Sequence, residues 1–312
     1  MKIEITVLNY NGAYLLEKCL PSIRVAARTS SYECELVVVD NCSTDDSRGL
    51  VSREFKEFEF YEASENKVLC SLNDRAKVSD ADIIIFLNND LIVDKGFIDP
   101  LIDIFKTRED VFLSAARVYN FDGSDIEEGR TKPVIRWGTL KAISKYKGYE
   151  KELDNISYTL QAGFGAFDRK KFLSLGGYDS LYLPGILDDT DVCFRAWRRG
   201  YRCYYQPASH IFHIGKASFQ KRFGNKRLLA ISHRNTYFFM WKNIKDKKIL
   251  FMNIAFILPR MVYAFFSLKW EIIHGFLWFI LRLSDVFKSR QHESEIGAYY
   301  TKTDKEIFRI FK

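Results

Sequence analysis

The sequence predicts an α/β fold with a mostly parallel central sheet, followed by a helical C-terminal region. Its first half alternates short apolar runs with helical patterns, an order typical of βαβ units. The strands of such units are buried on both faces and read as unbroken apolar runs, as residues 35–40 and 82–87 do. With 312 residues and 47% hydrophobic content, the chain suits one large domain with an appendage, or two small domains.

The expected elements follow one another along the first 90 residues. A helix over residues 13–25 is predicted because apolar side chains such as Leu16 and Leu20 recur on one face. A helix over residues 43–54 is predicted because a run of cap-type residues begins it. In chain order the set is a strand at 3–9, a helix at 13–25, a strand at 35–40, a helix at 43–54, a strand at 58–62, a helix at 66–78 and a strand at 82–87.

Two of the predicted strands end in polar residues. Asp40-Asn41 follows one of them, and Asn88-Asn89-Asp90 follows the other. Asn and Asp are also good turn formers, which would explain one such strand end about as well as a function does. Because parallel sheets bind ligands beyond the carboxyl ends of their strands, two such ends favour a binding site there.

The middle of the chain completes the domain. Residues 121–157 are polar and are expected to form an irregular loop or insertion over the site. A strand is predicted over 161–167, where glycines allow another group to approach the backbone. A short helix over 170–175 ends at Gly176-Gly177.

An acidic cluster, Asp188-Asp189-Thr190-Asp191, precedes a helix predicted over residues 192–199. One carboxylate at a helix N-terminus is explained by capping and by the helix dipole. Three carboxylates within four positions exceed that need and indicate a functional site.

The bulk composition limits the cellular setting. The net charge of +7 is compatible with nucleic acid, anionic lipid or phosphate-bearing substrates. No nucleic-acid reader motif is present, so no nucleic-acid partner is expected. The six cysteines form no C-x-x-C pair, and no signal peptide opens the chain, which favours a working part that faces the cytosol.

The composition changes beyond Lys226. Residues 250–268 and 272–283 are largely apolar, but Arg260 and Pro259 argue against a simple membrane span. Abundant aromatic residues flanked by Lys and Arg favour helices that lie in a membrane interface. The alternative is a helical appendage packed on the domain or on another subunit. We therefore expect a catalytic domain at 1–225 and a membrane-associated helical region at 226–312, peripheral on the inner face of the cell membrane.

Together these motifs form an ordered series over roughly residues 1–240. They are residues 6–11, residues 38–45, Asn66, Asn73, residues 87–90, residues 176–179, residues 188–191 with Cys193 and Arg195, residues 200–202, His213 with Gly215 and Ser218, and Arg234-Asn235. In this order they resemble family 2 glycosyltransferases of the GT-A fold, a Rossmann-like nucleotide-sugar-binding fold, and within them the rhamnosyltransferase-like branch.

The resemblance implies an inverting transfer of a sugar from a UDP-, dTDP- or GDP-sugar to a glycan or lipid-linked acceptor in cell-surface polysaccharide synthesis. Asp189 matches the catalytic base, and Asp188 lies beside it to orient the acceptor. Asp90 matches the last residue of the D-x-D motif, which binds Mg²⁺ or Mn²⁺, and His213 matches a histidine that completes the metal site in some relatives. The residues expected to bind the nucleotide-sugar are Leu8, Tyr10, Asp40, Asn66, Asn73, Asn89 and Asp191.

The chain departs from the family pattern at two places. Asn88-Asn89-Asp90 carries only one carboxylate, so the metal site is poorer in charge. Val68 and Arg75 stand where family members often have glycine, and Lys67 and Arg75 are expected to face the diphosphate instead.

Other functions fit less well. A nucleotidyltransferase would show a glycine-rich, basic loop after the first strand, and Asn9-Tyr10-Asn11-Gly12-Ala13 has no basic residue. A non-catalytic nucleotide- or glycan-binding protein on a transferase scaffold is compatible with the single carboxylate of the triplet. The intact Asp188-Asp189 pair argues against it.

Overall fold

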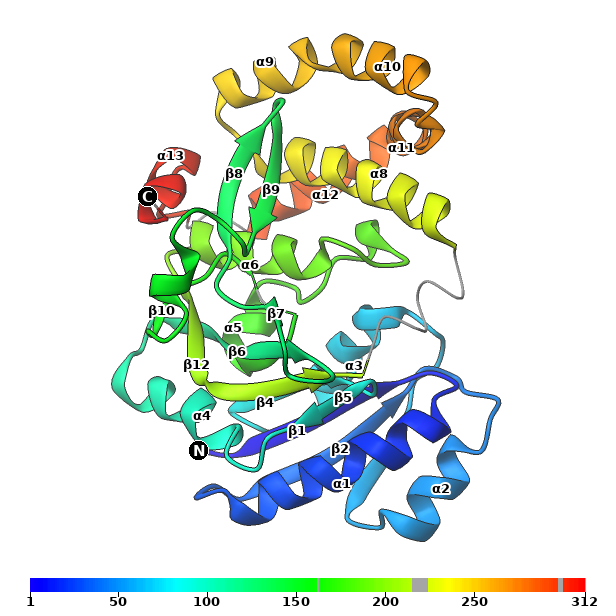
Figure 1. The fold of residues 1–312 in the computed structure, drawn as a ribbon, viewed down its shortest axis with the longest axis vertical. Coiled ribbons are helices and arrows are strands. Elements are labelled where there is room, and N and C mark those ends of the chain that lie inside the picture. The colour runs from blue at the N-terminus through cyan, green and yellow to red at the C-terminus, as the bar shows by residue number, and fades with distance from the viewer. Residues whose placement is uncertain (162, 215–223, 297–299, 312) are drawn as a thin grey trace.

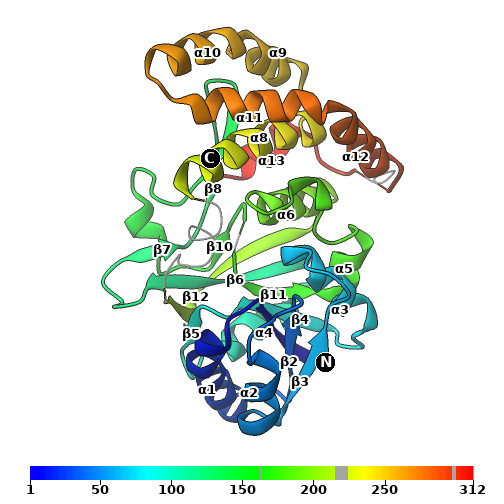
Figure 2. The same cartoon turned by 90° about the vertical axis from the view of Figure 1, so that its right-hand side faces the viewer.

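One mixed sheet forms the centre of the molecule (Figures 1 and 2). The computed structural model describes residues 1–161, 163–214, 224–296 and 300–311. Ala162, within the predicted strand at 161–167, and the motif residues Gly215 and Ser218 lie outside these ranges.

Four parallel strands make up the N-terminal half of the sheet. Their spatial order is β4 (Ile83–Asn88), β1 (Ile3–Asn9), β2 (Cys34–Asp40) and β3 (Phe58–Glu62). Alternate residues of β4 pack on opposite faces of the sheet, with Ile83 in one core and Ile84 in the other. This burial on both faces explains the unbroken apolar runs, and the predicted α/β fold class is confirmed.

Strand β11 (Gly165–Asp168) pairs antiparallel with both β4 and β6 (Val111–Asn120), and so joins the second half of the sheet to the first. Beyond it, β12 (Arg202–His213) runs parallel to β6. Three short strands complete the sheet, namely β5 (Leu91–Val93) and β10 (Ser157–Tyr158) on β12, and β7 (Ile126–Glu128) on β6.

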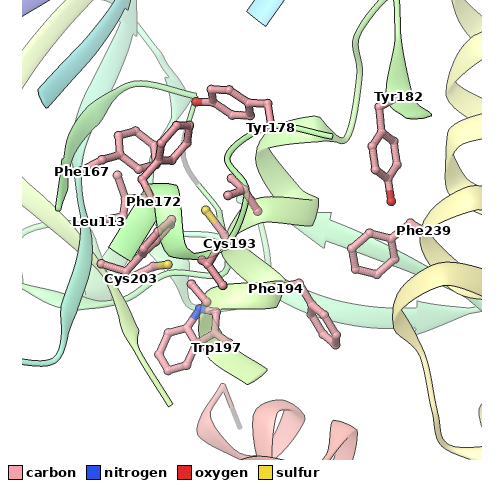
Figure 3. Close-up of a cluster of buried hydrophobic side chains, with 14 of the residues drawn as sticks. Leu113, Phe167, Phe172, Tyr178, Tyr182, Cys193, Phe194, Trp197, Cys203 and Phe239 are labelled. Carbon is pink, nitrogen blue, oxygen red and sulfur yellow. The ribbon is translucent and has the colours of Figure 1, made fainter. Parts of the chain in front are cut away.

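Helices cover both faces of the sheet. One face carries α1 (Ala13–Thr29), α2 (Ser47–Glu54) and α4 (Ile98–Thr107). The other carries α3 (Ser71–Val78), α5 (Arg169–Ser174) and α6 (Asp188–Arg198). Phe167 and Phe172 pack together in the core on this second face, and Phe194 and Trp197 of α6 belong to the same core (Figure 3). The predicted helix at 66–78 starts later than expected, with a short 3-10 turn at Val68–Cys70 before α3.

Residues 121–157 are more regular than predicted. They include a β-hairpin, β8 (Lys132–Arg136) and β9 (Thr139–Ile143), which forms its own two-stranded sheet. Trp137 and Gly138 at its tip both have positive φ, 51° and 70°, as a tight two-residue hairpin turn requires. A Cβ on Gly138 would lie 2.6 Å from the Met252 carbonyl oxygen, so glycine lets the hairpin tip touch the C-terminal helices.

The C-terminal region is helical, as predicted. Its helices are α8 (Asn225–Asn243), α9 (Lys247–Ala255), α10 (Ile257–Phe266), α11 (Trp270–Leu281), α12 (Leu283–Ile296) and α13 (Asp304–Ile310). These helices do not form a separate core. Phe239 of α8 stacks edge-on against Phe194, and Asp304 of α13 forms a buried ion pair with Arg198 of α6. The two predicted regions therefore share one hydrophobic core.

The segment Lys247–Phe266 lies farthest from the sheet (Figure 1). It is the one described helix long and apolar enough to cross a membrane by length and composition, with a mean hydropathy of 1.8. Only 11% of it is buried inside the protein, so its apolar side chains face outward.

Candidate functional site

A cleft of about 560 Å³ opens at the carboxyl ends of β1 and β4. The polar strand ends predicted to form a site meet here, and the start of α6 closes the opposite wall. The lining residues used below are Leu8, Tyr10, Asn66, Asn89, Asp90, Glu128, Asp188 and His213.

Asp90 and His213 lie side by side because of strand pairing. Asp90 directly precedes β5, and His213 ends β12, and these strands pair with Leu91 opposite His213. His213 Nε2 lies 3.2 Å from Asp90 Oδ2, and its Nδ1 lies 2.7 Å from Glu127 Oε2. The hydrogen bond to Asp90 is the main reason that the pKa of His213 is raised to about 9, so the imidazole carries a proton at neutral pH.

Asp90 Oδ1 is buried and has no hydrogen-bond partner among the residues that the structure describes. A buried carboxylate oxygen left without a partner is costly, and a cation would satisfy it. Within the described ranges no three His, Cys, Asp or Glu side chains gather closely enough to hold a metal ion. Such a site therefore fits Mg²⁺ or Mn²⁺ only if substrate oxygens supply further ligands, as Mg²⁺ sites usually require.

Glu127 and Glu128 were missed by the sequence reasoning. Strand β7 carries them to the cleft, where Glu128 faces the open space and Glu127 holds His213. Solvent reaches Glu128 through the cleft, but the surrounding protein and the charge of Asp189 raise the pKa of its carboxyl. The only sequence signal was the Glu127-Glu128 pair itself, within a stretch rich in charge.

Asp188 and Asp189 begin α6, and Asp188 lines the cleft. The Asp189 carboxylate accepts a 2.7 Å hydrogen bond from the Thr190 backbone N–H. Burial raises the pKa of both carboxyls, and for Asp188 the adjacent Asp189 charge adds to this effect. The Asp188–Asp189 pair therefore takes up a proton more readily than an exposed aspartate does, and this suits a group that must accept a proton.

The loop before α6 is held in an unusual backbone conformation. Ile186 and Leu187 have φ values of 73° and 71°, a region that branched and bulky residues rarely adopt. The Asn235 amide of α8 donates to three carbonyl oxygens of this loop, those of Tyr182, Gly185 and Ile186, at 3.1, 2.7 and 2.7 Å. Helix α8 thus fixes the segment that places Asp188 in the cleft wall, with Asp189 next to it in the chain but not among the described lining residues.

Leu8, Tyr10, Asn66 and Asn89, four of the residues predicted to bind the nucleotide-sugar, lie in the cleft wall. Asn89 donates a 2.6 Å hydrogen bond to the side-chain oxygen of Asn9, the last residue of β1.

Asn9 in turn donates a 2.8 Å hydrogen bond to Asp40. Asp40 also accepts from the Ser43 backbone and hydroxyl, and it is not among the lining residues of the cleft. Asp40, which was predicted to contact the nucleotide, therefore holds Asn9 and Ser43 in position from outside the cleft wall.

Three predicted contacts are corrected. Asn73 exchanges two hydrogen bonds with the Tyr178 backbone, at 2.8 and 2.9 Å, so its amide braces that turn and does not reach the cleft. Asp191 is completely buried among Arg195, Lys242 and other donors, so it cannot touch a nucleotide-sugar.

The third correction is Arg75, which forms a buried ion pair with Glu4 of β1 and does not face a diphosphate. Lys67 is engaged as well, because it pairs with Glu65 and Asp74. His210 Nε2 lies 2.9 Å from the Pro207 carbonyl oxygen, and His210 is not among the lining residues of the cleft.

Known proteins similar to this chain identify its family. Residues 4–176, more than half of the chain, match the family model described as "Glycosyl transferase family 2". The chain is 23% identical over 146 residues to the putative polypeptide N-acetylgalactosaminyltransferase 10 of Drosophila melanogaster, covering 45% of this chain and 23% of that protein. It is 22% identical over 187 residues to the O-antigen chain rhamnosyltransferase WbaN of Salmonella anatum, covering 57% and 56%. The chain thus spans under a quarter of the first relative and just over half of the second.

Solved structures show the same fold. GalNAc-T7, solved with UDP, GalNAc and Mn²⁺, superposes with a TM-score of 0.56 at 13% identity, covering 85% of this chain and 58% of that one. The mannosyltransferase PcManGT of Pyrobaculum calidifontis, solved with GDP-Man and Mn²⁺, gives 0.54 at 15% identity, covering 96% and 81%. These likenesses support the GT-A architecture with its C-terminal helical region.

The Asn235 contacts lead to a prediction. In Asn235→Ala, three loop carbonyls lose their partner, which should destabilise the fold by about 1–3 kcal/mol. The loop should relax from its positive φ values, and turnover should fall while nucleotide affinity stays unchanged. Asn253→Ala is the matched control, because Asn253 is equally buried but bonds Gly138 and Trp241 away from the cleft. Melting temperature, turnover and nucleotide titration would decide; equal loss of turnover in both variants contradicts the assignment.

Proposed function

The chain belongs to glycosyl transferase family 2, and from this premise we propose that it transfers a sugar from a nucleoside-diphosphate sugar to a glycan or lipid-linked acceptor. The observation that carries the proposal is the cleft, which has the partly buried Asp90 carboxylate just beyond β4 on one side and Asp188, the first residue of α6, on the other. The similarity to WbaN favours the rhamnosyltransferase-like branch and a role in cell-surface polysaccharide synthesis.

In this proposal the donor lies along the ends of β1 and β4. Leu8 and Tyr10 contact the nucleotide, while Asn66 and Asn89 bind the part of the donor that connects the nucleotide to the sugar. UDP and GDP-Man are bound by structural neighbours, so UDP-, GDP- and dTDP-sugars are the donors to compare.

Asp90, with His213 beside it, is proposed to hold Mg²⁺ or Mn²⁺. When bound, the ion supplies positive charge that neutralises the leaving diphosphate. Asp90 Oδ1, buried without a partner among the described residues, is the observation that supports this role. His213 must release its proton to act as a ligand, and its raised pKa makes that release harder at neutral pH, so ligation by His213 should be favoured at alkaline pH.

Asp90→Asn tests the metal site. The amide keeps the shape but loses the charge, so Mn²⁺ should no longer tighten nucleotide binding, a loss of at least about 10–100-fold in metal affinity. Asp94→Asn, at an exposed carboxylate just after β5, is the control and should behave like the wild type. Calorimetry with each nucleoside diphosphate, with and without Mn²⁺, gives the result. Full metal response in Asp90→Asn would refute the site.

The acceptor hydroxyl is proposed to give its proton to Asp189, while Asp188 orients the acceptor. The oxygen attacks the anomeric carbon from the face opposite the diphosphate, and this single displacement inverts the configuration. The hydroxyl loses its proton late, as the bond forms, so a well-placed carboxylate is a sufficient base. Because the pKa values of both aspartates are raised, activity should fall as the pH drops below neutral. A carboxyl that is already protonated cannot accept the proton of the acceptor hydroxyl.

Asp189→Asn should reduce turnover by on the order of 10² to 10⁴, the usual contribution of general-base catalysis, and should leave donor binding intact. Asp188→Asn is the comparison, because Asp188 lines the cleft more directly. Turnover would be followed by release of the nucleoside diphosphate, and the product anomer by NMR. Normal turnover in Asp189→Asn with a dead Asp188→Asn moves the base to Asp188, and a retained anomeric configuration rejects the mechanism.

We also propose that α9 and α10 rest on the inner, cytosolic face of the cell membrane. Their two interior polar residues, Asn253 and Arg260, turn toward the protein, where Asn253 bonds Gly138 and Arg260 bonds Tyr237. The outward face is left apolar, and Leu258 and Phe266 are 72% and 80% exposed. A helix held to the protein by its polar side suits a position in the membrane plane better than a span.

Leu258→Glu with Phe266→Glu should weaken vesicle binding by at least about tenfold, since each large apolar side chain contributes roughly 1.5–3 kcal/mol when buried. The matched control is Val25→Glu with Val78→Glu, which places two charges at exposed valines of α1 and α3. The fraction of each variant that sediments with vesicles measures its membrane binding, and the control should sediment like the wild type. Unchanged binding in the first variant would favour the packed-appendage interpretation.

A further inference from the structure

A second cavity, of about 890 Å³, lies between the β8–β9 hairpin and helices α8 and α10. It shares no lining residue with the donor cleft among the residues that the structure describes. The elements that line it, β8, β9, α8 and α10, lie at the end of the molecule opposite α1 and α2 (Figure 1).

The cavity is lined by basic side chains, none of which forms an ion pair with an Asp or Glu among the residues that the structure describes. Arg136 and Lys141 come from the hairpin, His233 from α8 and Arg260 from α10. No Asp or Glu is among its described lining residues. Arg260 bonds the neutral Tyr237 hydroxyl and the Trp137 carbonyl, and it forms no ion pair within the described ranges.

Burial and the positive charges around the cavity lower the pKa values of two of its lining residues. Burial lowers the pKa of His233 to about 4, with Lys141 and Arg260 adding to the effect and Glu271 opposing it weakly. Lys141 is reached by solvent in the cavity, but the protein around it and the Arg260 charge lower its pKa too. An anion placed among these groups would relieve their mutual repulsion.

The other walls are apolar and aromatic. Trp137, Phe256, Pro259 and Tyr263 line the cavity, and Phe256 packs edge-on against Trp137. Helix α10, which supplies Pro259 and Tyr263, carries the exposed apolar side chains of Leu258 and Phe266 on its outer side. A cation cluster set among apolar walls, on the helix that faces outward, matches a ligand with an anionic head and a hydrophobic chain.

We propose that this cavity binds the phosphate of an anionic phospholipid, with the acyl chains running out along α10. Lys141 and Arg260 pair with the phosphate, and the aromatic walls enclose the glycerol and the first carbons of the chains. The proposal rests on the proposed membrane association of α9 and α10, and it does not depend on sugar transfer.

The test uses the full chain and short-chain lipids below their micelle concentration. By calorimetry, dihexanoyl phosphatidylglycerol should bind saturably at one site. Glycerol phosphate, which lacks the chains, and dihexanoyl phosphatidylcholine, which has no net charge, should bind much more weakly. Equal binding of glycerol phosphate would indicate a site for free phosphate, and equal binding of both lipids would indicate apolar contact alone; each result overturns the proposal.

Lys141→Gln is the informative variant, because the Lys141 ammonium has no hydrogen-bond or ion-pair partner within the described ranges and its loss should not disturb the fold. It should weaken phosphatidylglycerol binding by about fivefold, the share of one basic contact at a lipid surface. Arg260→Gln should do so more strongly, but it also removes the bond to Tyr237.

The charge-matched control is Lys56→Gln, at an exposed position following α2 at the far end of the molecule. Lipid binding that falls equally in Lys56→Gln and Lys141→Gln refutes the cavity site. Asp90→Asn should bind the lipid normally, so a failed lipid test and a failed transferase test can be told apart.

Discussion

One buried carboxylate, that of Asp191, sets the geometry on which the cleft depends. Its two oxygens accept hydrogen bonds from Tyr182, Arg195, Lys242 and Asn243, at distances of 2.7–2.8 Å. A charge fully removed from water is tolerated only when its lone pairs are satisfied in this way. Burial acts to raise the pKa of Asp191, but Lys242 and Arg195 outweigh it and hold the carboxylate ionised. Because Lys242 and Asn243 belong to α8, this one group joins the first turn of α6 to the C-terminal helices, and the two predicted regions become one body.

The sequence predicted most of the sheet and the position of the site because both depend on local patterns. Buried parallel strands need apolar side chains on both faces, so the runs that form β2 and β4 are visible without a structure, and their polar ends mark Asp40 and Asp90. The roles of Asp191 and Asn73 could not be read in the same way. A carboxylate at a helix start is equally compatible with a ligand and with a buried partner such as Lys242, which lies 51 residues away in the chain. Glu128 was missed because only the pairing of β7 with β6 brings it to the cleft.

The apolar C-terminal segment illustrates a different limit. Arg260 in its middle was expected to disfavour a membrane span, and composition alone could not say where its side chain points. In the folded chain Arg260 and Asn253, seven residues apart, lie on the same side of the helix and hold it to α8 and the hairpin tip. The usual arrangement of a surface helix is thereby reversed, with polar contacts inside and apolar side chains outside. Exposed apolar side chains of this kind mark a surface that contacts something apolar, which is the physical reason for proposing that α9 and α10 rest on a membrane surface.

Helix α8 connects the two cavities of the molecule. Neighbouring residues of one turn face in two directions: Asn235 holds the loop that presents Asp188, whereas His233 and Tyr237 line the basic cavity beneath α10. Glycine at position 275 of α11 lets this helix pack closely on α8, since a Cβ there would lie 2.6 Å from the Ala230 carbonyl oxygen. The helix therefore has little room to move independently of its neighbours. If a lipid phosphate occupies the basic cavity, as proposed, it lies in a cavity whose wall includes His233 and Tyr237 of the same helix that holds the loop of Asp188, so the membrane surface and this end of the cleft are held in one fixed relation. That arrangement favours an acceptor that is itself anchored in the membrane over one that diffuses freely in solution.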